Sequence, residues 1–213
     1  MEMETETKKI KIYVLCGYKG SGKDTLVTLY RDYLKTNFKT NVTIEKYAFA
    51  DPLKDICYNV FSKNCRQLQR NHFDKVEYKE SPIQGLPNET TPRDLCLEVS
   101  KCIRGIYDNY FIDLIMKKIN NSISYHKFHD HGNENANILF VTDCRFQEEL
   151  YAVKNLQQEH TRVEVKTFWI KRFETPPNSH PSENSLNERD CDYIVENISK
   201  NTKTFLENFI GCL

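Results

Sequence analysis

The chain has 213 residues, enough for one domain with a full hydrophobic core and too few for two generous ones. Its 30 Lys and Arg residues balance 30 Asp and Glu residues, and this zero net charge argues against a nucleic-acid-binding protein, which needs a basic face. No apolar run is long enough to span a bilayer, and the polar, acidic start of the chain carries no apolar signal segment. The 8 cysteines are scattered and form no CxxC pair, so we expect reduced thiols in a cytoplasmic protein, several of them filling the core.

Apolar, β-rich runs alternate with helical stretches along the chain, and this pattern predicts an α/β fold with a parallel sheet. In chain order, we expect strands at residues 10–16, 42–48, 138–142, 163–170 and 193–195. We expect helices at residues 25–38, 52–61, from 92, about 107–123, 146 to about 157, and from 202. Polar sequence at residues 79–91, 125–137 and 174–187 predicts loops.

Residues 17–23 read GYKGSGK and lie between a predicted strand and a predicted helix. This is the G-x-x-x-x-G-K part of the phosphate-binding loop, in which glycines let backbone N–H groups turn toward a phosphate chain. We expect Lys23 to lie in an exposed loop and to reach the β- and γ-phosphates of ATP. The alternative is a glycine turn that caps a helix beside a solvated lysine. The residues predicted to bind ATP here are Gly17, Lys19, Gly20, Ser21, Gly22, Lys23, Asp24 and Thr25.

Two carboxylates are candidates to hold Mg²⁺ through its waters. Asp24 replaces the usual Ser or Thr ligand of the motif, although it can also simply favour a helix N-terminus electrostatically. Asp143 follows the predicted strand at 138–142, at the sheet edge where a metal-organising acid belongs. Arg145 can bridge donor and acceptor phosphates during transfer, although Asp143 and Arg145 can also be an ion pair that closes the strand. The predicted catalytic residues are therefore Lys23, Asp24, Asp143 and Arg145.

Four further segments add to this motif, and they read YAFADPLKD (47–55), PRDLCLEVSKCIR (92–104), VTDCRFQEE (141–149) and HPSENSL (180–186). With GSGKDT, this set in this order resembles the deoxynucleoside monophosphate kinases of bacteriophages and large DNA viruses, over residues 10–206. The phosphomevalonate kinases of animals are similar in the same segments. The resemblance implies a P-loop kinase fold with a core parallel sheet flanked by helices, an acceptor-binding insertion at about 50–125 and a lid at about 172–189.

The resemblance also implies an activity: the ATP- and Mg²⁺-dependent conversion of deoxynucleoside monophosphates to diphosphates, in the cytoplasm or a host's cytoplasm. The expected partners are these two nucleotides and a second copy of the chain in a homodimer, with no nucleic acid and no membrane. Two alternatives stay open. One is a phosphomevalonate kinase-like enzyme for another small molecule, and the other is a P-loop nucleotide-binding module without catalysis.

The same resemblance implies an acceptor site in which Phe49 lines the base and Asp51 and Lys54 lie nearby, although Asp51 can also N-cap the helix before Pro52. Arg93 and Arg104 are close to three helical turns apart, so both can face one phosphate monoester, unless they are ordinary surface arginines. Leu97, Ser100 and Lys101 replace the family's Gln, Gly and Thr, so the base preference is not inherited. The expected acceptor-binding residues are Phe49, Asp51, Lys54, Arg93, Leu97, Ser100, Lys101, Arg104, Phe111 and Glu149, the last of which can also hold Arg145 in place.

The expected lid carries Arg172 and Arg189 as candidates to close over ATP, with His180 in the same loop. Three further histidines stand in the segment YHKFHDHG, at residues 125–132. A zinc site would need a fourth ligand, and no cysteine pair or HExxH pattern accompanies them, so we interpret this segment as a polar loop and not as a metal site.

Overall fold

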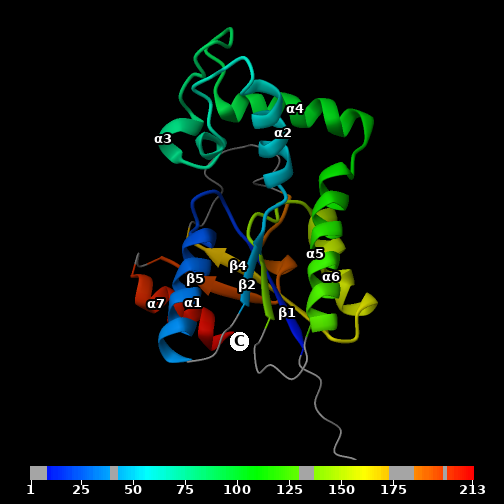
Figure 1. Cartoon of the computed structure of the whole chain (residues 1–213). Helices are drawn as coiled ribbons and strands as arrows, with labels where there is room; N and C mark the ends of the chain where they lie inside the picture. The colour runs from blue at the N-terminus through cyan, green and yellow to red at the C-terminus, as the bar shows by residue number, and fades with distance from the viewer. Residues whose placement is uncertain (1–8, 39–42, 130–136, 173–184, 199–200) are drawn as a thin grey trace, which may run out of the picture. The chain divides into compact units, whose positions relative to one another are not determined.

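The computed structural model describes residues 9–38, 43–129, 137–172, 185–198 and 201–213 (Figure 1). The chain folds into two compact units. Unit 1 combines Met1–Ala48 with Lys118–Leu213, and unit 2 is the continuous segment Phe49–Lys117. The insertion expected at about 50–125 thus overlaps unit 2, whose last residue is Lys117.

Unit 1 is built on a parallel sheet of five strands in the order β2-β3-β1-β4-β5, which confirms the predicted α/β class. The strands are β1 (Ile10–Cys16), β2 (Thr43–Tyr47), β3 (Asn137–Val141), β4 (Val163–Lys171) and β5 (Tyr193–Glu196). The central strand β1 places Val14 opposite Val141 of β3 and Thr167 of β4. Strands with neighbours on both edges and helices on both faces are largely apolar, and this explains the run IKIYVLC of β1, in which only Lys11 is exposed.

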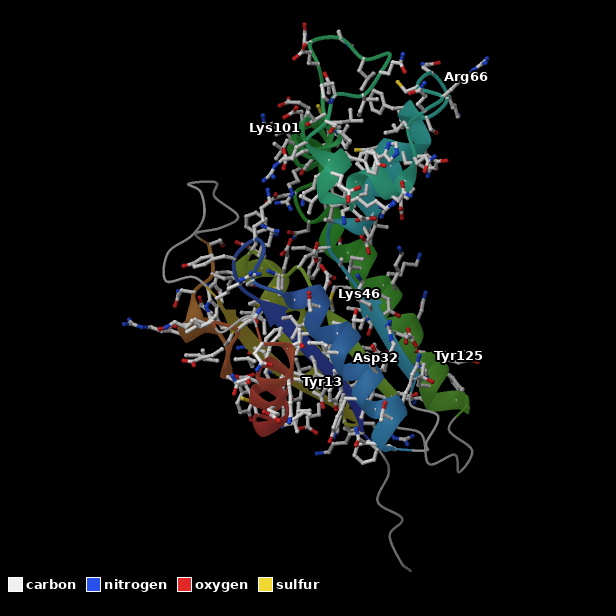
Figure 2. All side chains as sticks on the ribbon, turned by 90° about the vertical axis from the view of Figure 1, so that its left-hand side faces the viewer. Tyr13, Asp32, Lys46, Arg66, Lys101 and Tyr125 are labelled. Atoms are coloured by element: carbon white, nitrogen blue, oxygen red, sulfur yellow. The ribbon has the colours of Figure 1, made fainter. Side chains whose placement is uncertain are left out.

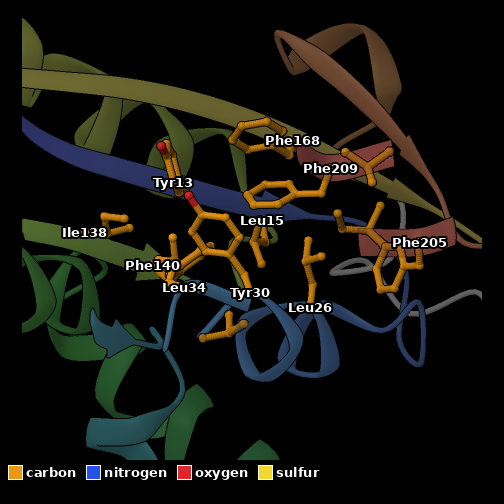
Figure 3. Packing of buried hydrophobic residues seen from close by; sticks show 13 residues of the cluster. Tyr13, Leu15, Leu26, Tyr30, Leu34, Ile138, Phe140, Phe168, Phe205 and Phe209 are labelled. Atoms are coloured by element: carbon orange, nitrogen blue, oxygen red, sulfur yellow. The ribbon is translucent and has the colours of Figure 1, made fainter. Parts of the chain in front are cut away.

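Helices cover both faces of this sheet (Figure 1). They are α1 (Lys23–Asn37), α5 (Tyr110–His129), α6 (Gln147–Glu159) and α7 (Thr202–Gly211), and α5 contributes residues to both units. The best-defined core lies where α1 and α7 meet alternate residues of the strands (Figure 3). Its members include Tyr13, Leu15, Leu26, Tyr30, Leu34, Phe140, Phe168, Phe205 and Phe209.

Unit 2 contains α2 (Asp51–Phe61), the 3₁₀ helix η1 (Arg70–Phe73), the single turn α3 (Val76–Lys79) and α4 (Pro92–Ile106). It has a small core of its own, made of Cys57, Cys65, Leu68, Phe73, Ile83 and Leu95. Helix α4 begins as predicted with Pro92 in its first turn, after a capping box in which Thr91 and Asp94 bind each other's backbone N–H groups.

Two local predictions are wrong, and two short elements were missed. The loop expected from residue 125 is helical as far as His129, because α5 runs six residues beyond the predicted end at 123. Asp51 does not cap α2: the N-cap is Ala50, and the Asp51 carboxylate instead lies 3.2 Å from the ammonium of Lys54. The short elements η1 and α3 were not expected. His131, His180 and most of the expected lid lie outside the described residues.

Among the described residues, no helix has the length and apolar character needed to cross a membrane.

Candidate phosphate-binding site

The loop between β1 and α1 is shaped by glycines in the left-handed backbone region. Gly17 and Gly22 have φ values of 130° and 104°. A Cβ on Gly17 would lie 2.7 Å from the carbonyl oxygen of Ile170, and one on Gly22 would lie 2.5 Å from the Nδ2 of Asn197. Both positions therefore require glycine for two reasons. One is the backbone conformation, and the other is the close approach of a neighbouring segment, which is β4 for Gly17 and the chain after β5 for Gly22.

Lys23 is the first residue of α1, and its side chain folds back over the loop. Its Nζ donates hydrogen bonds to the carbonyl oxygens of Gly17, at 2.6 Å, and Tyr18, at 2.9 Å. It also lies 3.3 Å from the Oγ of Ser21. Only 8% of Lys23 is exposed, so the lysine itself is buried although the loop was expected to be exposed. The loop carbonyls hold the ammonium in place, and a positive charge therefore stands inside the loop, beside a helix N-terminus, where a phosphate chain would need it.

Two side chains from the ends of strands support the loop from outside. Asn197, which directly follows β5 and is 9% exposed, donates from Nδ2 to the carbonyl oxygen of Ser21 at 2.8 Å. Arg172, which directly follows β4, donates from its guanidinium to the carbonyl oxygen of Gly20 at 2.8 Å. Arg172 was predicted to bind ATP, and this contact shows that it touches the phosphate loop. Asn197 was not among the residues predicted for the site. Both residues follow the carboxyl ends of parallel strands, the position at which α/β sheets gather functional groups, and that rule is the signal that points to Asn197.

Asp24 lies in the first turn of α1 with an exposed side chain. Its Oδ1 is 3.0 Å from the Nζ of Lys46 on β2, a cation that the sequence analysis did not single out (Figure 2). The carboxylate is thus next to a helix N-terminus, as its electrostatic interpretation requires. It is also open to solvent and available to metal-bound water. Thr25 follows it and is exposed.

The loop after β3 carries Asp143 and Arg145, and its backbone is fixed by Glu149. The Oε2 of Glu149 accepts hydrogen bonds from the backbone N–H groups of Arg145, at 2.8 Å, and Phe146, at 3.2 Å. Glu149 is only 3% exposed. Its carboxylate therefore positions the loop through the backbone, as a first-turn cap of α6. Because β3 and β1 are neighbouring parallel strands, the loops that follow them leave the same edge of the sheet.

Two buried thiols, Cys16 and Cys144, and the half-buried thiol of Cys191 form a cysteine cluster in unit 1, and Cys16 directly precedes the phosphate loop. Cys16 interacts with Cys144 and Cys191, and its hydrogen bond with Cys144, together with burial, raises the pKa of Cys16 well above the ordinary value. The hydrogen bond to Cys16 raises the pKa of Cys191 in the same way. These thiols stay protonated and unreactive, as the core-filling role predicted for the cysteines requires.

In unit 2, Asp51 and Lys54 belong to a network of charges. The Nζ of Lys54 contacts Asp74 at 2.8 Å as well as Asp51. Arg70 from η1 joins it through Asp55, at 2.5 Å, and Asp74, at 2.8 Å. Burial raises the pKa of Asp74, but the hydrogen bond from Lys54 and the charge of Arg70 outweigh it, and the net shift is downward. Arg70 was not among the predicted site residues, since nothing in the sequence links it to α2.

Helix α4 carries both predicted phosphate-binding arginines. Arg93, in its first turn, pairs with Glu80 at 2.6 Å, and Arg104, in its last turn, has its guanidinium 5.9 Å from the centre of the Phe111 ring. The other predicted acceptor residues differ in exposure: Phe49 and Phe111 are buried, Leu97 and Ser100 are half-buried, and Lys101 is exposed and pairs with Glu98.

Within the described ranges, no cluster of three or more His, Cys, Asp or Glu side chains is arranged to hold a metal ion. Magnesium that accompanies a nucleotide needs only one or two carboxylates besides phosphates and waters, and Asp24 and Asp143 are the two carboxylates predicted for that role.

Comparison with known proteins gives a limited result. No family model and no curated protein matches the sequence. Among solved structures, the Cys556Ala mutant of the APS kinase CysC from Mycobacterium tuberculosis is similar, with a TM-score of 0.38 and 10% identity over 96% of this chain and 99% of that one. APE1195 is similar with a TM-score of 0.39 and 14% identity over 96% of this chain and 94% of that one. Likeness at this level identifies neither a family nor a reaction.

Proposed function

We propose that this chain is an ATP- and Mg²⁺-dependent kinase that phosphorylates deoxynucleoside monophosphates to diphosphates. One observation carries most of the weight: a buried Lys23 ammonium, held by the carbonyls of Gly17 and Tyr18, at the start of the helix that follows the central strand. A loop of this composition in the strand–loop–helix setting is built to receive a polyphosphate. The substrate class rests on the resemblance of the five sequence segments.

In this proposal, the residues of unit 1 handle the donor. The loop N–H groups and Lys23 bind the β- and γ-phosphates, and Asp24 and Asp143 orient the waters of Mg²⁺. Arg145 neutralises charge that develops on the transferred group. No covalent intermediate and no strong general base are needed, because the attacking oxygen belongs to a phosphate that is already ionised at pH 7.

Unit 2 supplies the acceptor site in this proposal. Lys54, Arg93 and Arg104 are the cations for the monophosphate, and Phe49 is the candidate to contact the base. The ion pair between Arg93 and Glu80 holds the guanidinium in place before the acceptor arrives. Such preorganisation suits two-pronged binding of a phosphate.

Release of ADP from Mg-ATP, measured with a panel of acceptors, tests the proposal directly. We expect stimulation by at least one of dTMP, dGMP, dCMP and dAMP. Mevalonate 5-phosphate alone as a productive acceptor would select the other small-molecule kinase. If no acceptor stimulates ADP release and the protein still binds ATP, the result would favour the nucleotide-binding module without catalysis.

Replacing Arg93 by Lys separates the acceptor site from the donor site. Lysine keeps the charge but loses the planar guanidinium that can bind a phosphate with two hydrogen bonds. The value of kcat/KM for the deoxynucleotide should therefore fall roughly ten- to a hundredfold, which corresponds to a loss of about 1.5–3 kcal/mol of transition-state stabilisation. ATP binding, measured at equilibrium without acceptor, should stay near the wild-type value. Arg66→Lys is the matched control, because Arg66 is exposed in the same unit (Figure 2). Weaker ATP binding with normal acceptor kinetics would contradict the assignment of Arg93.

Asp143→Asn keeps the size of the side chain and removes the charge that orders metal-bound water. Turnover should fall, and the Mg²⁺ concentration needed for half-maximal rate should rise. Asp32→Asn, on the exposed side of α1, is the control and should change neither quantity (Figure 2). A lower rate with an unchanged Mg²⁺ titration would mean that Asp143 acts only on the structure of the loop.

A further inference from the structure

Unit 2 holds a pair of thiols that the proposed kinase reaction does not use. Cys57 lies on α2 and is fully buried, whereas Cys96 lies on α4 and is half-buried. Cys57 belongs to the small core of unit 2, and Cys96 packs against that core. The two helices thus bring two reduced cysteines together, one of them open to small molecules in solvent.

The surroundings of this pair make the two thiols chemically different. Cys57 donates its S–H to the sulfur of Cys96, and this hydrogen bond lowers the pKa of Cys96, with the charges of Lys54 and Arg70 acting in the same direction. Burial and the charge of Asp74 oppose the shift but do not cancel it. The pKa of Cys57 is raised by the same hydrogen bond and by burial. Cys96 is therefore the more nucleophilic sulfur, and Cys57 lies beside it as a neutral thiol.

The other cysteine cluster has the opposite character. Hydrogen bonding and burial raise the pKa of Cys16 and also that of the half-buried Cys191, and Cys144 beside Cys16 is buried. A partly exposed thiol of lowered pKa with a second thiol beside it is the arrangement found in cysteines that sense oxidants, and a thiol of raised pKa is not. The pair of Cys57 and Cys96 is thus the place in the described structure where oxidation has both a reactive and a resolving sulfur.

We propose that Cys57 and Cys96 form a reversible disulfide when a peroxide oxidises Cys96. In the first step, the Cys96 thiolate attacks one oxygen of the peroxide; an S–O bond forms, the O–O bond breaks, and the released hydroxide takes a proton to become water. In the second step, the Cys57 sulfur attacks the sulfenic sulfur of Cys96; an S–S bond forms, the S–O bond breaks, and the Cys57 proton leaves in a second water molecule. A dithiol reductant restores both thiols.

The disulfide would join the two helices that carry the proposed acceptor cations. Lys54 precedes Cys57 by three residues on α2, and Arg93 precedes Cys96 by three residues on α4, so each cation lies next to its cysteine on one helix face. Fixing α2 to α4 changes the positions of Lys54 and Arg93 and weakens acceptor binding. This consequence rests on the proposed function, whereas the disulfide itself does not.

The test treats the reduced full-length protein with hydrogen peroxide and maps its peptides by mass spectrometry without reduction. We expect a Cys57–Cys96 peptide that dithiothreitol removes, that Cys96→Ser abolishes, and that Cys102→Ser leaves in place. Cys102 is the matched control because it is exposed on the same helix. Cys96 should react at least about tenfold faster than Cys102, since the thiolate is the reactive form. In Cys57→Ala, which lacks the resolving sulfur, a dimedone adduct should accumulate on Cys96.

Two results would overturn the proposal. One is oxidation of Cys96 at or below the rate of Cys102, and the other is oxidation of Cys96 to sulfinic acid with no linkage to Cys57. The consequence for the acceptor is measured separately, as a severalfold rise in the KM of the deoxynucleotide after oxidation that dithiothreitol reverses. If the kinase proposal fails, the reduced protein is inactive on every acceptor, and the peptide map still decides the disulfide.

Discussion

The ammonium of Lys23 has two roles that a sequence motif does not separate. In the structure it neutralises the carbonyl dipoles of Gly17 and Tyr18, and in the proposed reaction it contacts phosphate oxygens. A buried cation that loses its partners is costly, and buried carbonyls that lose their donor are costly too. The same residue therefore contributes to stability and to catalysis, and a variant must be measured for both.

Lys23→Ala should abolish phosphoryl transfer and also lower the free energy of unfolding by about 1–3 kcal/mol, because two loop carbonyls lose a charged donor. Urea unfolding measures the stability, and ADP release measures the transfer. Lys9→Ala, at an exposed position before β1, is the control for general effects of removing a lysine. Unchanged turnover in a folded Lys23→Ala protein would refute the phosphate-loop assignment.

Asn197→Ala should weaken ATP binding severalfold and lower stability by about 1–3 kcal/mol, because the Ser21 carbonyl loses its buried donor. Asn208→Ala offers a close comparison: Asn208 also donates to a backbone carbonyl, that of Glu196 at 3.0 Å, but this hydrogen bond is exposed to solvent. Isothermal titration calorimetry with ATP compares the ATP affinities of the two variants. Equal losses for both variants would show that Asn197 does not position the loop.

At the scale of elements, the strands were predictable because their patterns are local. The run at 10–16 matches β1 in full, and the run at 138–142 matches β3 within one residue. Contacts between distant segments were not predictable. Glu149 binds the backbone N–H groups of Arg145 and Phe146, and Asn197 meets Ser21 across 176 residues. The fold class and the motif of the site thus follow from the sequence, whereas its supporting contacts depend on tertiary packing.

The end of α5 shows how composition misled the prediction. Its polar residues suggested a loop, but one of them, His126, faces a carboxylate on β2. The Nε2 of His126 lies 2.6 Å from the Oε1 of Glu45, and the hydroxyls of Ser122 and Tyr47 bind the other oxygen of Glu45. Burial raises the pKa of Glu45, but these hydrogen bonds outweigh it and bring the pKa below its ordinary value. A polar helix segment is stable here because its partners are also polar.

Glu45→Gln should therefore destabilise the protein by about 1–3 kcal/mol at pH 7, because charge-assisted hydrogen bonds become neutral ones. A lowered pKa means that ionised Glu45 stabilises the fold above its unfolded pKa and loses this contribution as the pH falls through its folded value. The difference between Glu45→Gln and the wild type should shrink in urea unfolding below about pH 4. Glu148→Gln, which is exposed, should show no such pH-dependent difference. A constant difference down to pH 3 would mean that the charge of Glu45 is not what matters.

At the scale of the whole molecule, the chain leaves unit 1 after Ala48 and returns to it at Lys118. Each unit has a core of its own, and the phosphate loop belongs entirely to unit 1. A ligand that binds one unit stabilises that unit by mass action, and the other responds only as far as the two are coupled.

Mg-ATP at about 100 times its Kd should add about 2.7 kcal/mol to the protection of slowly exchanging amides in unit 1. We expect a much smaller change in α2 and α4 of unit 2. Hydrogen exchange followed by mass spectrometry, with and without nucleotide, provides the comparison. Equal gains in both units would show that the molecule opens as one cooperative body.

The order of strands in the sheet has a consequence for synthesis on the ribosome. The strand made first, β1, is central, and its neighbours β3 and β4 come far later in the chain. About 150 residues separate the end of β1 from the start of β4, so at 5–20 residues per second the segment waits roughly 8–30 s for its second partner. Until then, the run IKIYVLC is an apolar, β-prone segment without a sheet, which is a hazard for association between nascent chains. The protein is therefore expected to depend on chaperones during its translation more than a chain whose first strand sits at a sheet edge.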